Sequence, residues 1–345
     1  MKKIIQQAFF QLRNQPLLSV ITVLGTALAI ALIMVILIVY QAKTADYAPE
    51  VNRSRSLYVK WERTVYDKKD PNSAGHSRPS LWLVKEIFYP LTTPEAVTAT
   101  YEGGEVLVGT VGSDEEMNTP LMLTDAAFWK VYQFRFLAGK PFTEADFQSG
   151  MKQAVIAKSV ARRLFGGAEN AIGKDILVNF AAYTVCGVVD DVNRFCEFTW
   201  SEVYAPYTSN AIASEAEAGQ TSGNNVITIL ARSTDDFDAI RNEVARGVAQ
   251  INTTLGDMEL QLMGQPDNFR MQLNRKFANQ YENLNANFWK YGIMILIILL
   301  VPAINLSGLT NTRMRRRLEE LGIRKAFGAT RNELVWQVLN ENLVL

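Results

Sequence analysis

The sequence predicts an α+β membrane protein, with transmembrane helices and a large mixed α/β extracytoplasmic domain inserted between the first and second spans. Two long runs, residues 14–42 and 291–312, carry no charged residue. Basic residues cluster beside these runs, whereas the region between them is acidic. That region mixes strand-like and helix-like patterns, which is typical of an α+β domain.

Residues 1–43 predict an N-terminal interfacial helix followed by the first span. The apolar centre, LLSVITVLGTALAIALIMVILIVY, is about 24 residues long, and a hydrocarbon core of about 30 Å needs roughly 20 helical residues. A cleaved secretory signal has a shorter apolar region, so we expect this span to be retained. Ile4, Ile5, Ala8 and Phe9 share one helical face and suit a helix lying in the membrane interface. An ordinary cytoplasmic extension of the span is an equal alternative.

Residues 289–312 predict the second transmembrane helix. Pro302 lies inside this run and is expected to kink it, while Trp289 stands at one end as an interfacial aromatic residue would. Residues 313–333 form a basic segment, and residues 334–345 predict the start of a third transmembrane helix, truncated by the end of the sequence. Two alternatives stay open: the sequence is a fragment, or its last segment docks on the others.

The charge distribution predicts the orientation of the spans. Lys2, Lys3 and Arg13 precede the first span, and seven basic residues follow the second between residues 313 and 331. Cytoplasmic flanks carry the excess of Lys and Arg, so both ends are expected inside. Residues 44–289 hold 23 Lys and Arg against 31 Asp and Glu. This acidic region, residues 44–288 as a domain, is therefore expected outside the membrane.

The extracytoplasmic region predicts alternating strands and helices. A strand is expected before a helix that ends at Gly166, and a hairpin is expected with strands near 175–180 and 183–189. One short helix is expected to start at a cap on Thr124, and a longer one at Ser233 or Thr234. The longer helix places these apolar residues on one face: Phe237, Ile240, Val244, Val248 and Ile251. The other predicted strands are 56–61, 104–112 and 225–233, and the predicted polar loops are 67–80 and 209–225.

Catalytic chemistry and metal binding are not indicated by the sequence. His76 is the one histidine and lies in a polar stretch, so we expect neither a metal site nor a catalytic residue. Residues 167–175 resemble a phosphate loop superficially, but five residues separate the two glycines where the motif needs four. Cys186 and Cys196 leave two alternatives open, a disulfide in an oxidising compartment or two buried free thiols.

The basic segment RRRLEELGIRKAFGATRNEL, residues 315–334, lies between two apolar runs. Gly322 and Gly328 are expected to break or bend its helix, or to let a partner come close. Its ordered mixture of apolar and basic residues favours contact with a groove on a soluble protein, to which it would pass motion. The alternative is an anchor whose arginines contact lipid phosphates.

The run ELGIRKAFGAT, Glu320–Thr330, resembles the signature that follows the second span in MacB/FtsX-type permeases of ABC transporters. The stretch FLAGKPFTEADFQSGMKQAVIAKSVARRLFGGAENAIGKDILVN resembles the MacB-like periplasmic core domain, and YTVCGVVDDV is similar to its following strand. The resemblance implies that residues 313–333 are a cytoplasmic coupling segment to an ATPase. Its signature residues are Glu320, Gly322, Ile323, Arg324, Lys325, Gly328 and Ala329.

The resemblance implies a function, a location and partners. Such permeases lie in the bacterial inner membrane as multi-pass proteins with a large periplasmic domain, and act as homodimers or heterodimers. A cytoplasmic ABC ATPase binds the ATP, so the permease itself needs no cofactor and is not an enzyme. Here the ATPase is expected to be a separate polypeptide. ATP hydrolysis drives mechanotransmission to the periplasmic domain, for export of peptides, antibiotics or lipoproteins, or for control of envelope enzymes.

The implied partners also include membrane lipid and a periplasmic adaptor or substrate, and no nucleic acid is expected. The alternative function is a two-span membrane sensor with a periplasmic ligand-binding domain. A sensor needs a dimerising coiled coil or phospho-acceptor residues after its second span. The sequence has no histidine and no sustained heptads there, which favours the permease.

Overall fold

The computed structural model describes residues 16–112, 115–278, 280–281, 289–290, 292–300, 318–332 and 334–336. The chain divides into two compact units, one made of Met1–Gln41 with Asn285–Leu345 and the other of Ala42–Leu284. Three predicted features lie outside the described residues: the interfacial helix, the second span from residue 301 onward with its Pro302 kink, and the third span beyond residue 336.

Helix α2, Pro16–Thr44, contains the predicted first span. Its 29 residues rise about 1.5 Å each, roughly 43 Å in all, more than a bilayer core of about 30 Å requires. Between Val23 and Thr44 the mean hydropathy is 2.8, and among the described parts of the chain this is the one helix long and apolar enough to cross a membrane. Leu24 and Leu28 are each 63% exposed, so the helix is not the buried core helix of a soluble domain.

Residues 292–300 are also helical and carry no charge. Ile293 and Leu296 are exposed, as are most of their apolar neighbours. This is the described part of the predicted second span.

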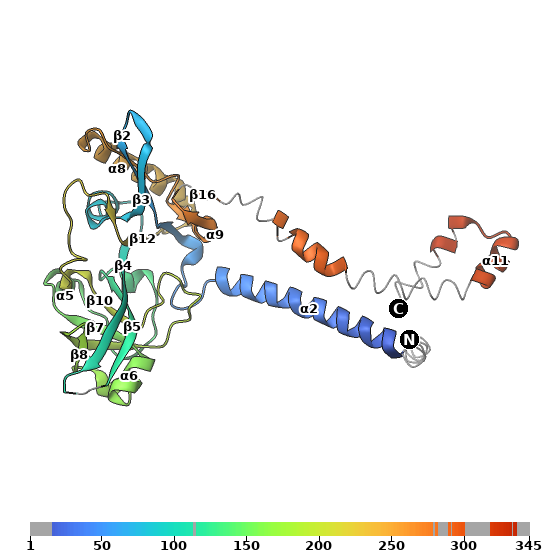
Figure 1. The fold of residues 1–345 in the computed structure, drawn as a ribbon, viewed down its shortest axis with the longest axis horizontal. Coiled ribbons are helices and arrows are strands. Elements are labelled where there is room, and N and C mark those ends of the chain that lie inside the picture. The colour runs from blue at the N-terminus through green and yellow to red at the C-terminus, as the bar shows by residue number, and fades with distance from the viewer. Residues whose placement is uncertain are drawn as a thin grey trace. The chain divides into compact units, whose positions relative to one another are not determined.

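A ten-stranded mixed sheet forms the centre of the second unit (Figure 1). Its strand order is β14-β1-β12-β4-β5-β10-β7-β9-β6, with β8 pairing to β4 and β9. The pairs β10–β5 and β7–β9 are parallel and the others are antiparallel. The strands are β1 Ser56–Val59, β4 Ala96–Thr110, β5 Glu116–Thr124, β6 Phe136–Gly139, β7 Gln153–Ala157, β8 Asp175–Val178, β9 Ala181–Val189, β10 Val203–Pro206, β12 Asn225–Leu230 and β14 Asp267–Asn268.

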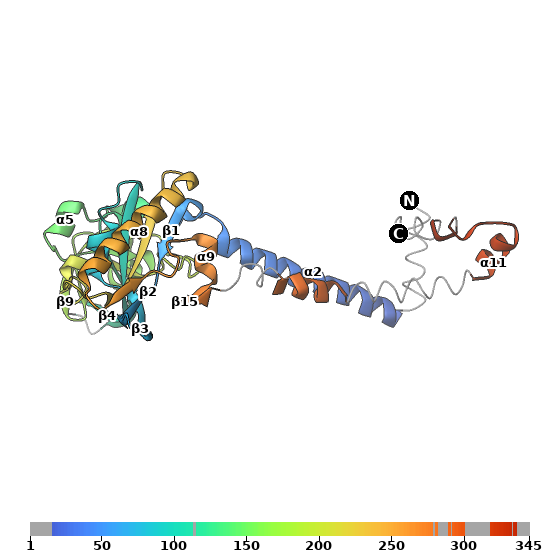
Figure 2. The same ribbon diagram turned by 90° about the horizontal axis from the view of Figure 1, so that it is seen from above.

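Two smaller sheets and several helices complete this unit (Figures 1 and 2). The four-stranded sheet has the order β11-β3-β2-β13, and β15 pairs with β16. Their strands are β2 Glu62–Asp67, β3 Asp70–Pro79, β11 Ser222–Gly223, β13 Glu259–Gln261, β15 Arg275–Phe277 and β16 Gln280–Tyr281. The helices are η1 Arg53–Arg55, α3 Leu81–Leu83, η2 Val84–Phe88, α4 Phe128–Val131, α5 Glu144–Gln148, α6 Lys158–Phe165, α7 Ala168–Ala171, η3 Tyr207–Ser209, η4 Thr234–Asp236, α8 Phe237–Thr254 and α9 Phe269–Asn274.

The predicted strand–helix and hairpin of residues 153–189 are confirmed. Strand β7 passes directly into α6, which ends at Gly166 with φ +76°, a left-handed conformation that glycine adopts without strain. Strands β8 and β9 form the predicted hairpin. The predicted strands at 56–61 and 225–233 are β1 and β12, and both are buried along their whole length.

Helix α8 follows the capping box at Ser233 and Asp236, as predicted. Its residues Ile240, Val244 and Ile251 are buried, and Gly247 approaches Ile87 so closely that an added Cβ would lie 3.0 Å from a methyl group. The predicted apolar face is therefore the one that packs against the domain.

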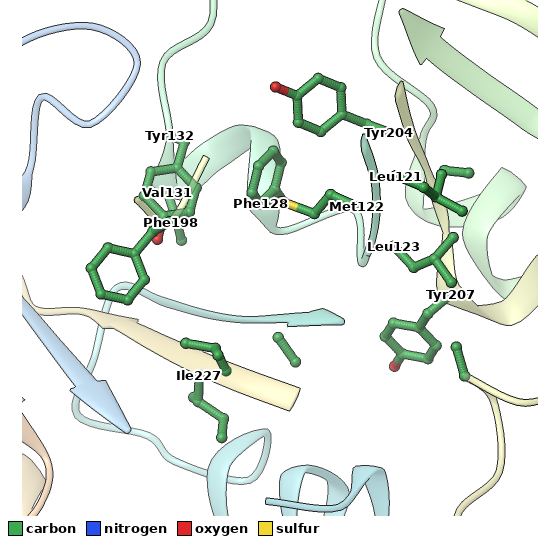
Figure 3. Packing of buried hydrophobic residues seen from close by; sticks show 14 of the residues in the cluster. Leu121, Met122, Leu123, Phe128, Val131, Tyr132, Phe198, Tyr204, Tyr207 and Ile227 are labelled. Carbon is green, nitrogen blue, oxygen red and sulfur yellow. The ribbon is translucent and has the colours of Figure 1, made fainter. Parts of the chain in front are cut away.

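The core of this unit contains a cluster of aromatic side chains (Figure 3). Phe128 lies against Tyr132 and Tyr204, with ring centroids 4.9 and 5.9 Å apart. Leu123 on β5 and Ile227 on β12, two strands that are separated by β4, belong to the same buried cluster. Aromatic pairs at such separations add to the free energy of area burial.

Two expectations from the sequence are wrong. The predicted loop at 67–80 contains the whole of strand β3, Asp70–Pro79, because pairing with β2 satisfies its backbone although most of its side chains are polar. Helix α4 starts later than expected, and its first N–H groups are capped by Asp125: the carboxylate of Asp125 accepts from the N–H of Phe128. The hydroxyl of Thr124 instead donates to the carbonyl of Ala99.

The Asp125 carboxylate joins α4, β4 and η2 inside the domain. It is 4% exposed and also accepts from the hydroxyls of Tyr89 and Thr98, at 2.7 Å each, and from the N–H of Ala99 at 2.9 Å. Burial raises the pKa of Asp125, although these hydrogen bonds oppose the shift. The side chain thus connects three elements that are distant in sequence.

We expect Asp125→Ala to lower the free energy of unfolding by about 3 kcal/mol or more, because four buried donors lose their acceptor. Urea unfolding of the full chain in detergent, followed by tryptophan fluorescence, measures this. Asp125→Asn is the matched control that keeps the size. A raised pKa means that wild-type stability falls as pH rises through the carboxyl range, so the gap between wild type and Asp125→Asn should narrow with rising pH. A widening gap contradicts this account.

Candidate functional site

The coupling segment predicted at residues 313–333 contains helix α11, Leu318–Ala326. The helix ends in a left-handed Gly328 with φ +97°. The N–H of Ala329 donates to the carbonyl of Arg324, and the N–H of Gly328 donates to that of Lys325. These two bonds are those of a Schellman motif, in which glycine supplies the positive φ. Gly328 therefore terminates the helix, as predicted.

Gly322 lies inside α11 and does not break it, contrary to one of the two roles expected for this residue. Its backbone continues the helix, and a Cβ added there would meet no described atom within 4 Å. Glycine in an exposed helix costs about 1 kcal/mol relative to alanine. Among the described residues, none comes close enough to Gly322 to exclude a side chain at this position.

The residues after Gly322 present an exposed surface of mixed character. Ile323 is 58% exposed and Phe327 is 89% exposed. The side chains of Arg324, Lys325 and Arg331 are exposed beside them. Glu320 lies in the helix, but its side chain is outside the described residues. An almost fully exposed phenylalanine among basic groups is typical of a surface that a partner covers.

A second functional region lies where the chain leaves α2 and enters the domain. The Arg53 side chain is 1% exposed and bonds to both sides of this junction. Its Nη1 donates to the carbonyls of Ala45 at 2.8 Å and Lys43 at 3.4 Å, and its Nη2 donates to the carbonyl of Phe195 at 3.0 Å. The Lys43 carbonyl in the last turn of α2, the Ala45 carbonyl just after the helix and the Phe195 carbonyl in a loop therefore share one guanidinium.

Glu50 holds this guanidinium in place. Its Oε2 accepts from Arg53 Nε at 2.7 Å, and its Oε1 accepts from the N–H of Phe198 and the hydroxyl of Thr199. Burial raises the pKa of the Glu50 carboxyl, and the positive charge of Arg53 opposes that shift. Removing one partner of a buried ion pair typically costs 3–5 kcal/mol because the other is left unpaired, so we expect about that cost here.

The exit from the domain has a matching buried pair. Arg275 donates to both carboxylate oxygens of Asp267, through Nε and Nη2, and to the carbonyls of Ala278 and Met263. Both side chains are at most 2% exposed. The segment that leads toward the second span is thus held to the domain by a forked arginine contact.

Entry and exit lie side by side. Strand β14, which contains Asp267, pairs with β1, which follows Arg53 directly. The ring of Phe269 on α9 lies 5.0 Å from the Arg53 guanidinium and 5.7 Å from the ring of Tyr58. We call these two buried pairs, Arg53–Glu50 and Arg275–Asp267, the membrane junction. The members of each pair are three and eight residues apart in the sequence, but nothing in the sequence indicates their burial or the distant contact of Arg53 with the Phe195 carbonyl.

The two cysteines are free thiols, so the disulfide alternative is wrong for this structure. Cys186 lies in β9 and its sulfur contacts the carbonyl of Ala154 on β7 at 3.4 Å. Cys196 is buried in the turn after β9, beside the junction. Burial raises the pKa of the Cys186 thiol to about 12. The side chains pack in separate environments, which the spacing of ten residues did not reveal.

Metal ligands are not gathered in the described parts of the chain: no group of three His, Cys, Asp or Glu residues is placed to hold an ion. His76 lies on β3 with its side chain exposed.

Two family models match the chain. The MacB-like periplasmic core domain matches residues 19–246, and the FtsX-like permease C-terminal matches residues 292–345. The first covers α2 and most of the sheet, and the second covers α11.

Several known proteins are similar over most of this chain. The uncharacterized ABC transporter permease YknZ of Bacillus subtilis (strain 168) is 22% identical over 332 residues, covering 95% of this chain and 78% of that protein. The macrolide export ATP-binding/permease protein MacB of Wolinella succinogenes is 25% identical over 348 residues, covering 99% of this chain and 50% of that protein.

The crystal structure of the YknZ extracellular domain aligns with 60% of this chain and 99% of that domain, at 19% identity and a TM-score of 0.42, too low to argue from. The family assignment therefore rests on the sequence matches, which together span the domain, its first helix and the coupling segment. On these matches, the chain belongs to the MacB/FtsX-type permeases of ABC transporters, which are membrane proteins with a periplasmic domain.

Proposed function

We propose that this permease transmits the motion of a separate cytoplasmic ATPase to its periplasmic domain. The observation that carries the proposal is the exposed surface of α11, in which Gly322 has open space around it and Ile323 and Phe327 are exposed. A helix that presses into a groove of a soluble partner uses apolar anchors at its surface, and Ile323 and Phe327 supply them. The partner binds and hydrolyses ATP, so the permease carries no nucleotide.

The membrane junction supplies the second requirement of this mechanism, a stiff connection. Motion of a transmembrane helix reaches a domain only if the linker does not absorb it, and flexible linkers do absorb it. Here the carbonyls of Lys43 and Ala45 and the loop at Phe195 share the Arg53 guanidinium. The forked contact of Arg275 with Asp267 does the same at the exit.

The two-span sensor alternative is not supported by an observation on the described residues. The two family matches, to the MacB-like periplasmic core domain and to the FtsX-like permease C-terminal, favour the permease over the sensor. Whether the mechanism exports a molecule or controls an envelope enzyme is a question about the periplasmic partner. The coupling proposal is the same in either case.

We expect Gly322→Leu to abolish stimulation of the co-purified ATPase by the permease, with a loss of about tenfold or more, because the side chain fills the contact. Gly322→Ala separates the stability of the helix from its contact with the ATPase. It should strengthen the helix by up to about 1 kcal/mol and still reduce stimulation. The measurement is nucleotide hydrolysis by the purified complex in nanodiscs.

The matched control for this experiment is Gly292→Leu. Gly292 is likewise helical with open space around its Cα, but it lies in the apolar helix at 292–300. Its replacement should leave stimulation unchanged. Equal effects of the two leucine substitutions, or no effect at Gly322, would count against contact through α11.

We expect Arg53→Lys to separate hydrolysis from movement. Lysine keeps the charge beside Glu50, but it cannot donate to Ala45 and Phe195 at once as the planar guanidinium does. ATP hydrolysis should continue, while nucleotide-dependent changes in hydrogen exchange across residues 42–55 and 195–199 should disappear.

Arg55→Lys is the control for the Arg53 variant. Arg55 pairs with Glu95, and their side chains are 32% and 34% exposed. A half-exposed pair of this kind contributes little, about 0–1 kcal/mol, so exchange changes should persist. Persistence of those changes in Arg53→Lys as well would remove the junction from the mechanism.

A further inference from the structure

The end of the periplasmic domain around α9 carries a group of exposed apolar and basic residues that the coupling mechanism does not use. Helix α9 buries Phe269 and Gln272 and turns Arg270 and Leu273 outward. Three apolar side chains here are exposed to a degree that is uncommon for large residues. They are Phe195 at 44%, Leu273 at 37% and Phe277 at 55%.

Contacts through buried neighbours relate these residues to the same end of the domain. Phe195 and Phe269 both contact Arg53, the first through its carbonyl and the second through its ring. Gln272 on α9 reaches Glu197 at 3.5 Å. The Phe277 ring lies 6.0 Å from that of Trp61. The basal surface is defined here as Arg194, Phe195, Arg270, Leu273 and Phe277.

The position of the basal surface follows from the chain itself. Helix α2 ends at Thr44, and the carbonyl of the next residue, Ala45, bonds to the same guanidinium as the Phe195 carbonyl. The two carbonyl oxygens are therefore no more than roughly 8 Å apart, given the fixed fork of an arginine. In Figures 1 and 2, α9 and β15 lie at this same end of the domain.

The polar layer of a bilayer is about 5–8 Å thick on each side of its hydrocarbon core. The apolar run of α2 ends at Ala42, and Lys43 follows it, so residues 43–45 belong in that layer. The Phe195 carbonyl, no more than roughly 8 Å from that of Ala45, is therefore close to where the chain leaves this layer. Exposed apolar groups flanked by arginines are the composition with which proteins bind a membrane interface.

Charges near the basal surface are consistent with this placement. The side chains of Arg194 and Arg270 are exposed, and the Arg194 guanidinium lies 4.9 Å from the ring centroid of Trp200. The neighbouring acid, Glu197, is paired with Lys60. The arginines thus present positive charge where lipid phosphates are expected.

From these observations we infer that the basal surface rests on the outer leaflet of the membrane and inserts Phe195, Leu273 and Phe277 among the lipid headgroups. In this position the basal surface limits how far the domain can tilt relative to the membrane. The inference depends on α2 crossing the bilayer and not on contact with an ATPase. Vesicles without nucleotide or ATPase therefore test it separately from the coupling proposal.

The experiment places a nitroxide spin label at each of the positions 195, 273 and 277 in turn, using Phe195→Cys, Leu273→Cys and Phe277→Cys. The full chain is reconstituted in vesicles of phosphatidylethanolamine and phosphatidylglycerol. Burial raises the pKa of both native thiols, so labelling at neutral pH favours the exposed introduced cysteine. Power saturation then compares collisions with oxygen, which concentrates in lipid, and with a polar nickel chelate.

Control labels are placed by Val111→Cys and Phe180→Cys, at residues that are 71% and 78% exposed. Phe180 follows β8, at the far end of the domain from α9 (Figure 1). The oxygen-to-nickel ratio is expected to be about threefold or more higher at the basal positions than at the controls, as for side chains in the interface.

Equal ratios at basal and control positions would overturn the inference. Low access to both reagents at the basal positions would overturn it too, since that result indicates a protein partner rather than lipid. Three independent basal positions keep the test decisive if one variant fails to fold.

Discussion

The Arg53 guanidinium is the interaction on which the rest of the structure depends. One planar group bonds to the end of α2, to Glu50 and to the carbonyl of Phe195, and it packs against the rings of Tyr47 and Phe269. A fully buried arginine is unfavourable unless all of its donors are satisfied. Each of these segments must therefore be in place together. This constraint makes the end of a membrane helix part of the folded domain.

The coupling segment, unlike the surroundings of Arg53, has few buried contacts among its described residues. Helix α11 is short, and its described side chains are mostly exposed, so its own packing contributes little to its stability. The Schellman motif at Gly328 fixes where the helix ends, and Gly322 weakens its interior. A short exposed helix of this kind has little packing of its own, which fits the proposal that a partner covers it. The membrane junction, in contrast, consists of buried ion pairs within the domain.

Much of the fold could be predicted from the sequence, because local patterns determine it. The β7–α6 unit, the β8–β9 hairpin and α8 follow from apolar periodicity, a capping box and a glycine stop. Strand β3 could not be predicted, since its pairing with β2 is a backbone interaction beneath polar side chains. The start of α4 could not be predicted from Thr124, because the N-cap position is Ala127 and the N–H of Phe128 donates to Asp125, which also serves a buried network.

The coupling segment and the membrane junction also differ in how far the sequence predicts them. The residues from Glu320 to Ala329 form a contiguous motif and could be found by reading along the chain. The junction could not, because Arg53 meets Phe195 only after the sheet has formed, and Arg275 resembles any other basic residue until Asp267 is placed beside it. The sequence also could not predict that Cys186 is a free thiol, because its contact with the Ala154 carbonyl on β7 forms only in the folded sheet.

The most direct test of the central claim is photo-crosslinking from position 327 in intact membranes, with a benzophenone side chain replacing that of Phe327. The account predicts one dominant crosslinked product between the permease and a nucleotide-hydrolysing protein, identified by mass spectrometry. The yield of this product should fall when nucleotide changes the contact. Crosslinks to lipid alone, or to another part of the permease, would contradict it.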